Sequence, residues 1–340
     1  MATRRQQLRQ IEALLKDLEP RVRDAFLAAI IAARRSVDLA ALEEALAAGD
    51  WRRAVTLLTM NQVLLFPLDA ALVSGYASGG ATVAADALAA GVVIGFDGRH
   101  VRAETWVREY VGGFIREIVA DQEAMVRSTV EALLSAGRTP AAAALDMVGR
   151  IERASGRRAG GYIGLTEAQA SYALNARTEL EALSREYFSR TLRDRRFDRL
   201  VERAIRDGKP LSAAQVDQIT GRYRDRLLAH RGETIARTES ITALRAGRRE
   251  GYQQAVDAGT IADSRLTRTW DATMDSRTRE DHRAMHKSTL QGMAAPWVLP
   301  DGSRMMFPGD GSLGAAASEI VRCRCYEAFD VDWLSGPMGE

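Results

Sequence analysis

Apolar residues recur at helical spacing along most of the chain. Within residues 4–50 they fall three or four positions apart, as on the buried face of an amphipathic helix: Ile11, Leu14, Leu15, Leu18, Val22, Phe26, Ile30 and Ile31. The same spacing continues in residues 103–136, 140–153 and 166–186, and again from about 213 to 258. We therefore expect a mainly α fold with a long helical N-terminal and central region.

Local signals indicate where several of these helices begin and end. Two sequences match the capping box that opens a helix, Thr166 with Gln169 and Ser212 with Gln215. Pro20 and Gly232 are expected to separate helices. The Gly/Ser/Ala segment 74–80 contains no phosphate-loop motif, so we expect a flexible turn between helices there.

From Ser264 onward the pattern changes from helical spacing to alternation. Residues 266–270 and 320–329 alternate as strands, and 297–307 indicate a hairpin around a Pro-Asp-Gly turn. A small α+β C-terminal module is therefore expected to follow the helices. The predicted organisation is a helical assembly region at 1–95, a central helical domain at 96–260, the module at 261–332 and a tail at 333–340.

Composition narrows the class of protein without identifying it. Hydrophobic residues make up 46% of the 340 positions and charged residues 27%, with a net charge of +2. These values are ordinary for a soluble protein and give no global argument for nucleic-acid or membrane binding. Arginine alternates with acidic residues in 187–207, which favours a solvated, salt-bridged helix face over a nucleic-acid face.

Three features of the sequence indicate the cellular compartment. Two cysteines indicate a reducing compartment rather than a disulfide scaffold. No signal peptide is visible in the polar N-terminus. The apolar stretch 81–96 contains Asp86 and is too short to span a bilayer, so no membrane partner is expected.

The candidate chemistry is concentrated in residues 270–325, which hold both cysteines and two of the four histidines. A helix capped by Asp275 or Ser276 and ending near Lys287 would place His282 and His286 one turn apart on one face. A strand would place Cys323 and Cys325 on one face. These four side chains suit tetrahedral zinc, and a structural metal would help so small a module to fold.

Two other interpretations of these side chains stay open. A site that uses only one histidine is the first. In the second, the cysteines are small buried hydrophobic residues and the histidines are hydrogen-bonded groups without a metal. Glu239 lies on a semi-apolar helix face with Thr242, and we favour a structural pairing of its carboxylate with an arginine of the module over a catalytic role.

Several short motifs in this part of the chain, in their order, resemble the phage Mu F-like minor head proteins, also called phage head morphogenesis proteins. The motifs are Arg237-Thr238-Glu239, Trp270-Asp271, Asp275-x-Arg277-Thr278-Arg279-x-x-His282, Pro308-Gly309-Asp310 and Cys323-Arg324-Cys325. The match covers about residues 230–330. The family usually has an asparagine before Cys-Arg-Cys, where this chain has Arg322, and often a glycine soon after the histidine, where this chain has His286-Lys287.

The resemblance implies a minor head (capsid) protein of a tailed phage or prophage-derived particle, acting in head morphogenesis near the portal. Portal protein and major capsid or scaffold proteins are the implied partners, with phage DNA as a further one. The implied location is the head or connector region of the virion, and the host cytoplasm during assembly. Eight residues are expected to have structural or docking roles: Arg237, Thr238, Glu239, Trp270, Asp271, Asp275, Arg277 and Arg279.

Two alternative functions follow from the residues themselves. In a metal-dependent hydrolase or nuclease, Asp271, Asp275, His282 and a metal would activate water. In an internal DNA-binding protein, the arginine clusters would contact phosphates. A closed set of four ligands favours a structural metal, whereas three ligands leave a place for water. The sequence therefore favours a non-enzymatic protein, and no catalytic residue is assigned.

Overall fold

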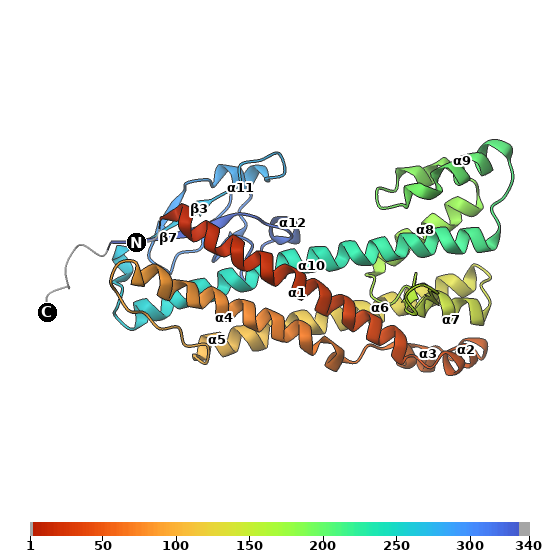
Figure 1. Ribbon diagram of the computed structural model, residues 1–340, viewed down its shortest axis with the longest axis horizontal. Helices are drawn as coiled ribbons and strands as arrows, with labels where there is room; N and C mark the ends of the chain where they lie inside the picture. Colours follow the sequence, from red (N-terminus) through yellow and green to blue (C-terminus); the bar gives the residue numbers. More distant parts are fainter. Residues whose placement is uncertain (1–2, 333–340) are drawn as a thin grey trace. The chain divides into compact units, whose positions relative to one another are not determined.

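The computed structural model describes residues 3–332, so the predicted tail at 333–340 lies outside the described residues. The fold is mainly α, with small strands in the C-terminal part (Figure 1), and this confirms the predicted fold class. The α-helices are α1 (Arg4–Ser36), α2 (Leu39–Ala47), α3 (Trp51–Leu58), α4 (Phe66–Leu88), α5 (Val101–Trp106), α6 (Gly112–Ser135), α7 (Pro140–Val148), α8 (Glu167–Glu181), α9 (Asp198–Asp207), α10 (Ala213–Asp257), α11 (Glu280–Ala284) and α12 (Ala317–Ile320).

Short helical segments and strands connect and extend these helices. The 3₁₀ segments are η1 (Gln62–Leu65), η3 (Arg185–Ser189), η4 (Arg195–Phe197) and η5 (Asp263–Arg265), and η2 (Val107–Val111) is π-helical. The strands are β1 (Arg150–Ile151), β2 (Arg158–Ala159), β3 (Leu266–Asp271), β4 (Thr289–Gln291), β5 (Trp297–Val298), β6 (Arg304–Met305) and β7 (Tyr326–Val331).

The chain divides into two compact units that do not follow the order of the sequence. The first unit comprises the chain up to Arg23, Leu68–Gly112 and the chain from Glu233 onward. The second comprises Asp24–Pro67 and Gly113–Gly232. The predicted segments at 1–95, 96–260 and 261–332 stay a prediction.

In the first unit, α4 and α10 pack with their backbones unusually close. A Cβ added to Gly79 would lie 2.1 Å from the carbonyl oxygen of Leu244, and one added to Gly247 would lie 1.8 Å from that of Tyr76. Side chains at these positions would therefore force the two helices apart. This packing explains why the Gly-rich segment 74–80, predicted as a turn, lies inside α4 instead.

The two predicted helix breaks are also wrong, because α1 continues through Pro20 and α10 through Gly232. Pro20 is exposed, and so is Lys16, the residue whose carbonyl loses its helical donor. A glycine inside a helix costs only about 1 kcal/mol, which a long and largely buried helix tolerates. Both capping boxes form as predicted, and Ser212 and Gln215 exchange side-chain-to-backbone hydrogen bonds of 3.3 and 2.9 Å.

Buried Asp146 of α7 is the centre of a charged network in the second unit. Its carboxylate accepts hydrogen bonds from Arg138 at 2.7 Å, Arg150 at 3.0 Å and Arg224 at 3.4 Å. A buried carboxylate needs such partners to offset its lost hydration. The network therefore links α7 to α10 and to the short β1–β2 ladder, two strands that the sequence did not predict.

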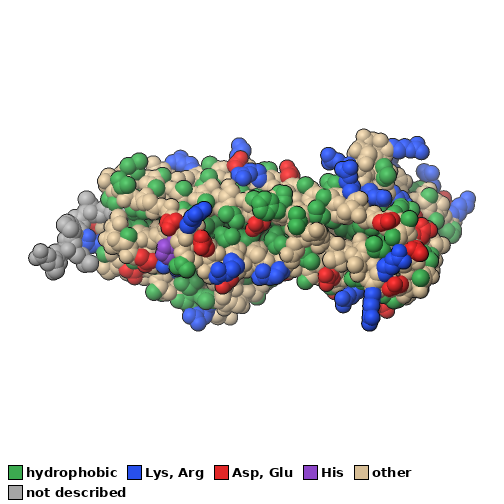
Figure 2. All heavy atoms as spheres, turned by 90° about the horizontal axis from the view of Figure 1, so that it is seen from below, with side chains coloured by type: hydrophobic (Ala, Val, Ile, Leu, Met, Phe, Trp, Pro, Cys, Tyr) green, Lys and Arg blue, Asp and Glu red, His purple; other side chains and the backbone are tan. Residues whose placement is uncertain are grey.

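The arginine-rich stretch 187–207 forms three short helical pieces in place of one helix. Several of its arginines pair as expected: Arg190 with Glu179, Arg193 with Asp198 and Arg196 with Asp194. Arg195, Arg199 and Arg203 are exposed and have no ion-pair partner among residues 3–332. On the face shown in Figure 2, basic and acidic side chains are interspersed, as the small net charge suggests.

The C-terminal module is built on a three-stranded antiparallel sheet of order β4-β3-β7. Central β3 pairs Trp270 with Glu327, and the predicted hairpin forms as β5–β6 with Trp297 opposite Met305. The core of the module contains Trp270, Trp297, Leu299, Met305, Cys323 and Cys325. Both cysteines therefore lie at the centre of the module.

One segment of the described residues, Trp51–Leu88, is long and apolar enough to cross a membrane by length and composition alone. It is not one continuous helix, because residues 59–61 between α3 and η1 are not helical. Core helices of soluble proteins meet the same criterion, and the glycine face of α4 packs on α10. The expectation of no membrane partner stays a prediction.

Candidate metal centre

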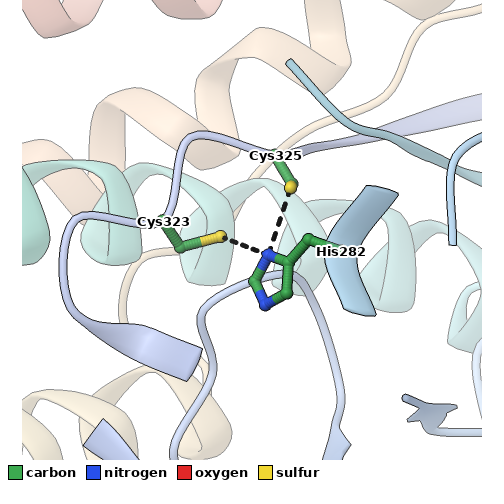
Figure 3. A group of neighbouring side chains, drawn as sticks. All are labelled: His282, Cys323 and Cys325. Carbon is green, nitrogen blue, oxygen red and sulfur yellow. Dashed lines mark hydrogen bonds between the residues drawn. The ribbon is translucent and has the colours of Figure 1, made fainter. Parts of the chain in front are cut away.

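Three side chains from the predicted set meet inside the module. The Nδ1 atom of His282 lies 3.3 Å from the sulfur of Cys325 and 3.6 Å from that of Cys323. Figure 3 shows both contacts converging on this nitrogen, while the other ring nitrogen points away from the sulfurs. The exposed fractions are 1% for His282, 2% for Cys323 and 3% for Cys325, so the group is shielded from solvent.

His282 lies on α11, which is shorter than the predicted helix of about 276–287. The helix begins after Arg279, and Asp275 caps no helix, since its carboxylate accepts a hydrogen bond from the backbone N–H of Arg277 in a tight turn. It ends before Lys287, whose φ of 69° is left-handed and whose N–H donates to the carbonyl of Trp270. The chain then enters β4 beside β3.

The Cys-x-Cys stretch is not the strand that the alternation predicts, because β7 begins only at Tyr326. Arg322 has a φ of 56°, which breaks the extended conformation, and Cys323 donates its N–H to the carbonyl of Ile320 at 3.0 Å. The loop still places both cysteine side chains on one side, against His282. The predicted grouping of the two thiols with a histidine therefore survives the change of local structure.

Two arginines hold the segment before α11 to the loop that carries Cys323 and Cys325, which we call the cysteine loop. Arg324 donates to both carboxylate oxygens of Asp275, at 2.6 Å each, and Arg279 donates to the carbonyl of Val321 at 2.6 Å. The hydrogen bonds from Arg324 hold the pKa of Asp275 well below its usual range. Predicted docking residues Asp275 and Arg279 thus act inside the module, next to the group.

Arg245, which sequence reasoning missed, connects helix α10 to the cysteine loop. Its buried guanidinium donates to the carbonyl of Pro308 at 2.7 Å and of Cys323 at 3.4 Å, and also to that of Cys325. A positive charge at this position favours negative charge on the sulfurs nearby. The only hint in the sequence was an arginine on the same helix as the Arg-Thr-Glu motif.

The two thiols share their protons unequally. The pKa of Cys323 is held well below its usual value, first by a hydrogen bond from the Cys325 thiol and then by Arg245. The same hydrogen bond raises the pKa of Cys325. Trp270 closes the group edge-on to the His282 ring at 5.3 Å between centroids. The surroundings thus favour ionisation of Cys323 before that of Cys325.

The structure does not bring His286 to this group. Its Nδ1 accepts the backbone N–H of Ala272 at 3.2 Å and lies 3.3 Å from a carboxylate oxygen of Asp271. Among residues 3–332, the metal-compatible group that contains the cysteines has one histidine, His282. The arrangement corresponds to the one-histidine alternative that the sequence left open.

Three of the remaining predicted docking residues lie on α10. Thr238 accepts the N–H of Arg322 at 3.1 Å through its hydroxyl, and Glu239 accepts the hydroxyl of Tyr110 at 2.9 Å. Arg237 is exposed and lines a cavity of about 310 Å³ that Cys325 also borders. Arg277 is exposed, with a nitrogen 3.7 Å from Asp275. Thr238 therefore docks the cysteine loop directly onto α10.

Comparison with protein families supplies one match. The model of the family described as Phage Mu protein F like protein matches residues 195–327, which include α10, α11 and the cysteine loop. No curated protein and no solved structure matches the chain. The motif-based resemblance is thus confirmed over residues 195–327, which are similar to this family.

Proposed function

We propose that this protein is a minor head protein of a tailed phage or prophage-derived particle and acts in head morphogenesis near the portal. The family match supports the role in head morphogenesis and an assembly-related location. The observation that carries the proposal is that the matched region contains α10 together with most of the small module that docks on it through Arg245 and Thr238.

We further propose that His282, Cys323 and Cys325 hold a zinc ion with a structural role. Two thiolates and an imidazole are donors that zinc prefers. Tetrahedral zinc with ordinary bond lengths separates its nitrogen and sulfur ligands by about 3.5 Å. The distances of 3.3 and 3.6 Å from Nδ1 to the two sulfurs fit that requirement.

Such an ion would join α11 to a loop about 40 residues later in the chain, inside a module with a small sheet. Binding free energy at a site that exists only in the folded state adds directly to folding free energy. The metal would thus keep the module in the form that docks on α10. The partner proteins would then meet a preformed surface.

The role in assembly can be tested with the particle itself. A tagged chain should copurify with the portal protein encoded by the same phage genome, and it should be present in mature heads. Cys323→Ser/Cys325→Ser should reduce both the copurification and the amount in mature heads. The control variant Arg277→Ala, which keeps both cysteines, should reduce neither, because Arg277 is exposed. Fully infectious particles that lack the protein would contradict the proposal.

A metal-dependent hydrolase is the second candidate, and one observation favours it. The group supplies three ligands, and Cys325 borders the cavity of about 310 Å³, so a water molecule and a substrate have space nearby. Asp271, however, pairs with His286, and Asp275 pairs with Arg324, so these two carboxylates have partners other than the three candidate ligands. Metal-dependent nuclease or hydrolase activity that His282→Ala abolishes would establish this candidate.

Phage DNA is a further proposed partner. Arg199 and Arg203 lie one turn apart on α9, Arg195 lies in the adjoining η4, and all three side chains are exposed. Their guanidinium groups have no ion-pair partner in the described part of the chain, so phosphates could take that place. DNA binding that weakens steeply with salt, and less steeply in Arg199→Gln/Arg203→Gln, would support this partner.

A further inference from the structure

The second ring nitrogen of His282 lies beside a carboxylate that no sequence motif contains. Glu319 of α12 places its Oε2 atom 2.9 Å from Nε2 of His282, the ring nitrogen that does not face the sulfurs. The exposed fraction of Glu319 is 9%, so its carboxylate has lost most of its hydration. The imidazole thus lies between the two sulfurs and a buried carboxylate.

Glu319 differs from other buried carboxylates of the first unit. Asp86 receives hydrogen bonds from Arg248 and Tyr252. Glu327 receives them from Arg268 and Trp297. Within residues 3–332, the group within ion-pair distance of Glu319 is the His282 ring alone.

Two further acidic side chains lie beside Glu319, since carboxylate oxygens of Asp281, Asp301 and Glu319 all lie within 4.8 Å of one another. Neither Oε2 of Glu319 nor Nε2 of His282 has a hydrogen-bond partner of ordinary geometry in the described part of the chain. A buried polar atom without a partner is costly, and the ring nitrogen 2.9 Å away is the group that can supply a donor to this oxygen.

We propose that Glu319 is a positioning residue of the metal centre, which in the metal-loaded protein accepts the Nε2–H of His282 and thereby makes Nδ1 the metal-binding atom. A neutral imidazole carries one proton, and a carboxylate at Nε2 keeps the proton there. The lone pair of Nδ1 then faces Cys323 and Cys325. Carboxylate partners of this kind also fix the ring orientation and increase the basicity of the ligand.

The divalent ion would offset the two thiolates of Cys323 and Cys325. A buried ion whose charge is offset avoids the large desolvation cost of an isolated ion. This inference rests on the proposed metal centre and assigns one more residue to it.

Zinc affinity of the full chain, measured by competition with a chromophoric chelator, tests the proposal. Glu319→Ala should weaken zinc binding by about ten- to a hundredfold, and Glu319→Gln, which keeps the volume and one acceptor oxygen, by a smaller factor. Asp301→Asn is the matched control. It removes a charge from the same acidic group but does not contact the imidazole, and it keeps the acceptor for Ser303. Its zinc affinity should equal that of the wild type.

A second readout identifies the metal-binding nitrogen directly. In long-range ¹⁵N spectra of the zinc-loaded protein labelled on its four histidines, His282 should show a metal-bound Nδ1 and a protonated Nε2. Binding through Nε2, or Glu319 variants that bind zinc as tightly as Asp301→Asn, would overturn the role of Glu319 and leave the metal centre standing. A wild type that binds no zinc would overturn the metal centre and the role of Glu319 together.

Discussion

Arg324 donates to both carboxylate oxygens of Asp275 at 2.6 Å, and this bidentate pair ties the residue between the two cysteines to the turn that precedes His282. The two residues are 49 positions apart in the sequence. A planar guanidinium matches a carboxylate with two parallel hydrogen bonds, so the pair fixes orientation as well as distance. The metal-binding group is therefore aligned by a contact outside it.

This pair predicts how stability depends on pH. Arg324 lowers the pKa of Asp275 in the folded state. The stabilisation that the pair contributes is therefore complete above the unfolded-state pKa of about 4, and it is lost as the pH falls through the folded-state pKa. The urea midpoint of the wild type should exceed that of Asp275→Asn at pH 6. The difference should shrink as pH drops below about 4. With chelator in all samples, a difference that does not change with pH would contradict the assigned contact.

Two departures from the family pattern coincide with unusual backbone conformations. Lys287 has a φ of 69° and Arg322 a φ of 56°, in the left-handed region that favours glycine and asparagine. Lys287→Gly and Arg322→Asn should therefore each stabilise the protein by about 1 kcal/mol in chemical unfolding. Lys16→Gly, in the middle of α1, should instead destabilise it by about 1 kcal/mol. Destabilisation by all three changes would show that the two conformations carry no strain.

The close packing of α4 on α10 predicts a large effect from adding single methyl groups. Gly79→Ala and Gly247→Ala place a Cβ against backbone carbonyls and should each cost about 1–3 kcal/mol or more in the free energy of unfolding. Gly95→Ala is the control, because a Cβ there meets nothing within 4 Å. Equal thermal unfolding midpoints for all three variants would mean that the helices are not in this contact.

The guanidinium of Arg245 predicts that α10 and the cysteine loop unfold together. Arg245→Ala leaves buried carbonyls of Pro308, Cys323 and Cys325 without their donor and should cost about 2–3 kcal/mol. Arg237→Ala, an exposed arginine two turns earlier on α10, should change stability by less than about 0.5 kcal/mol. Urea unfolding of both variants measures the difference, and similar small effects would exclude Arg245 as the docking contact.

Local signals in the sequence were sufficient where the structure depends on neighbouring residues. The capping boxes at Thr166 and Ser212 and the hairpin at 297–307 form because turn and cap chemistry acts over a few positions. The grouping of His282 with both cysteines was also predictable, since few residue types bind soft metals and they are concentrated in one part of the chain.

Long-range contacts decided the remaining features. A glycine that lets two helices approach, such as Gly79, has the same local signal as a glycine in a turn, and only its partner Leu244 distinguishes them. Arg245 contacts the carbonyl of a residue 80 positions away, and nothing near either residue indicates it. His286 follows His282 by four positions, but α11 ends before it, because Lys287 pairs with the end of β3.

Elemental analysis of the purified protein tests the central claim, a metal centre with three protein ligands, most directly. The wild type, prepared without chelators, should contain about one zinc per chain, and Cys323→Ser/Cys325→Ser should contain none. His286→Ala should keep the full zinc content, because His286 faces Asp271 and Ala272. Wild-type protein without metal, or loss of zinc in His286→Ala, would contradict the account.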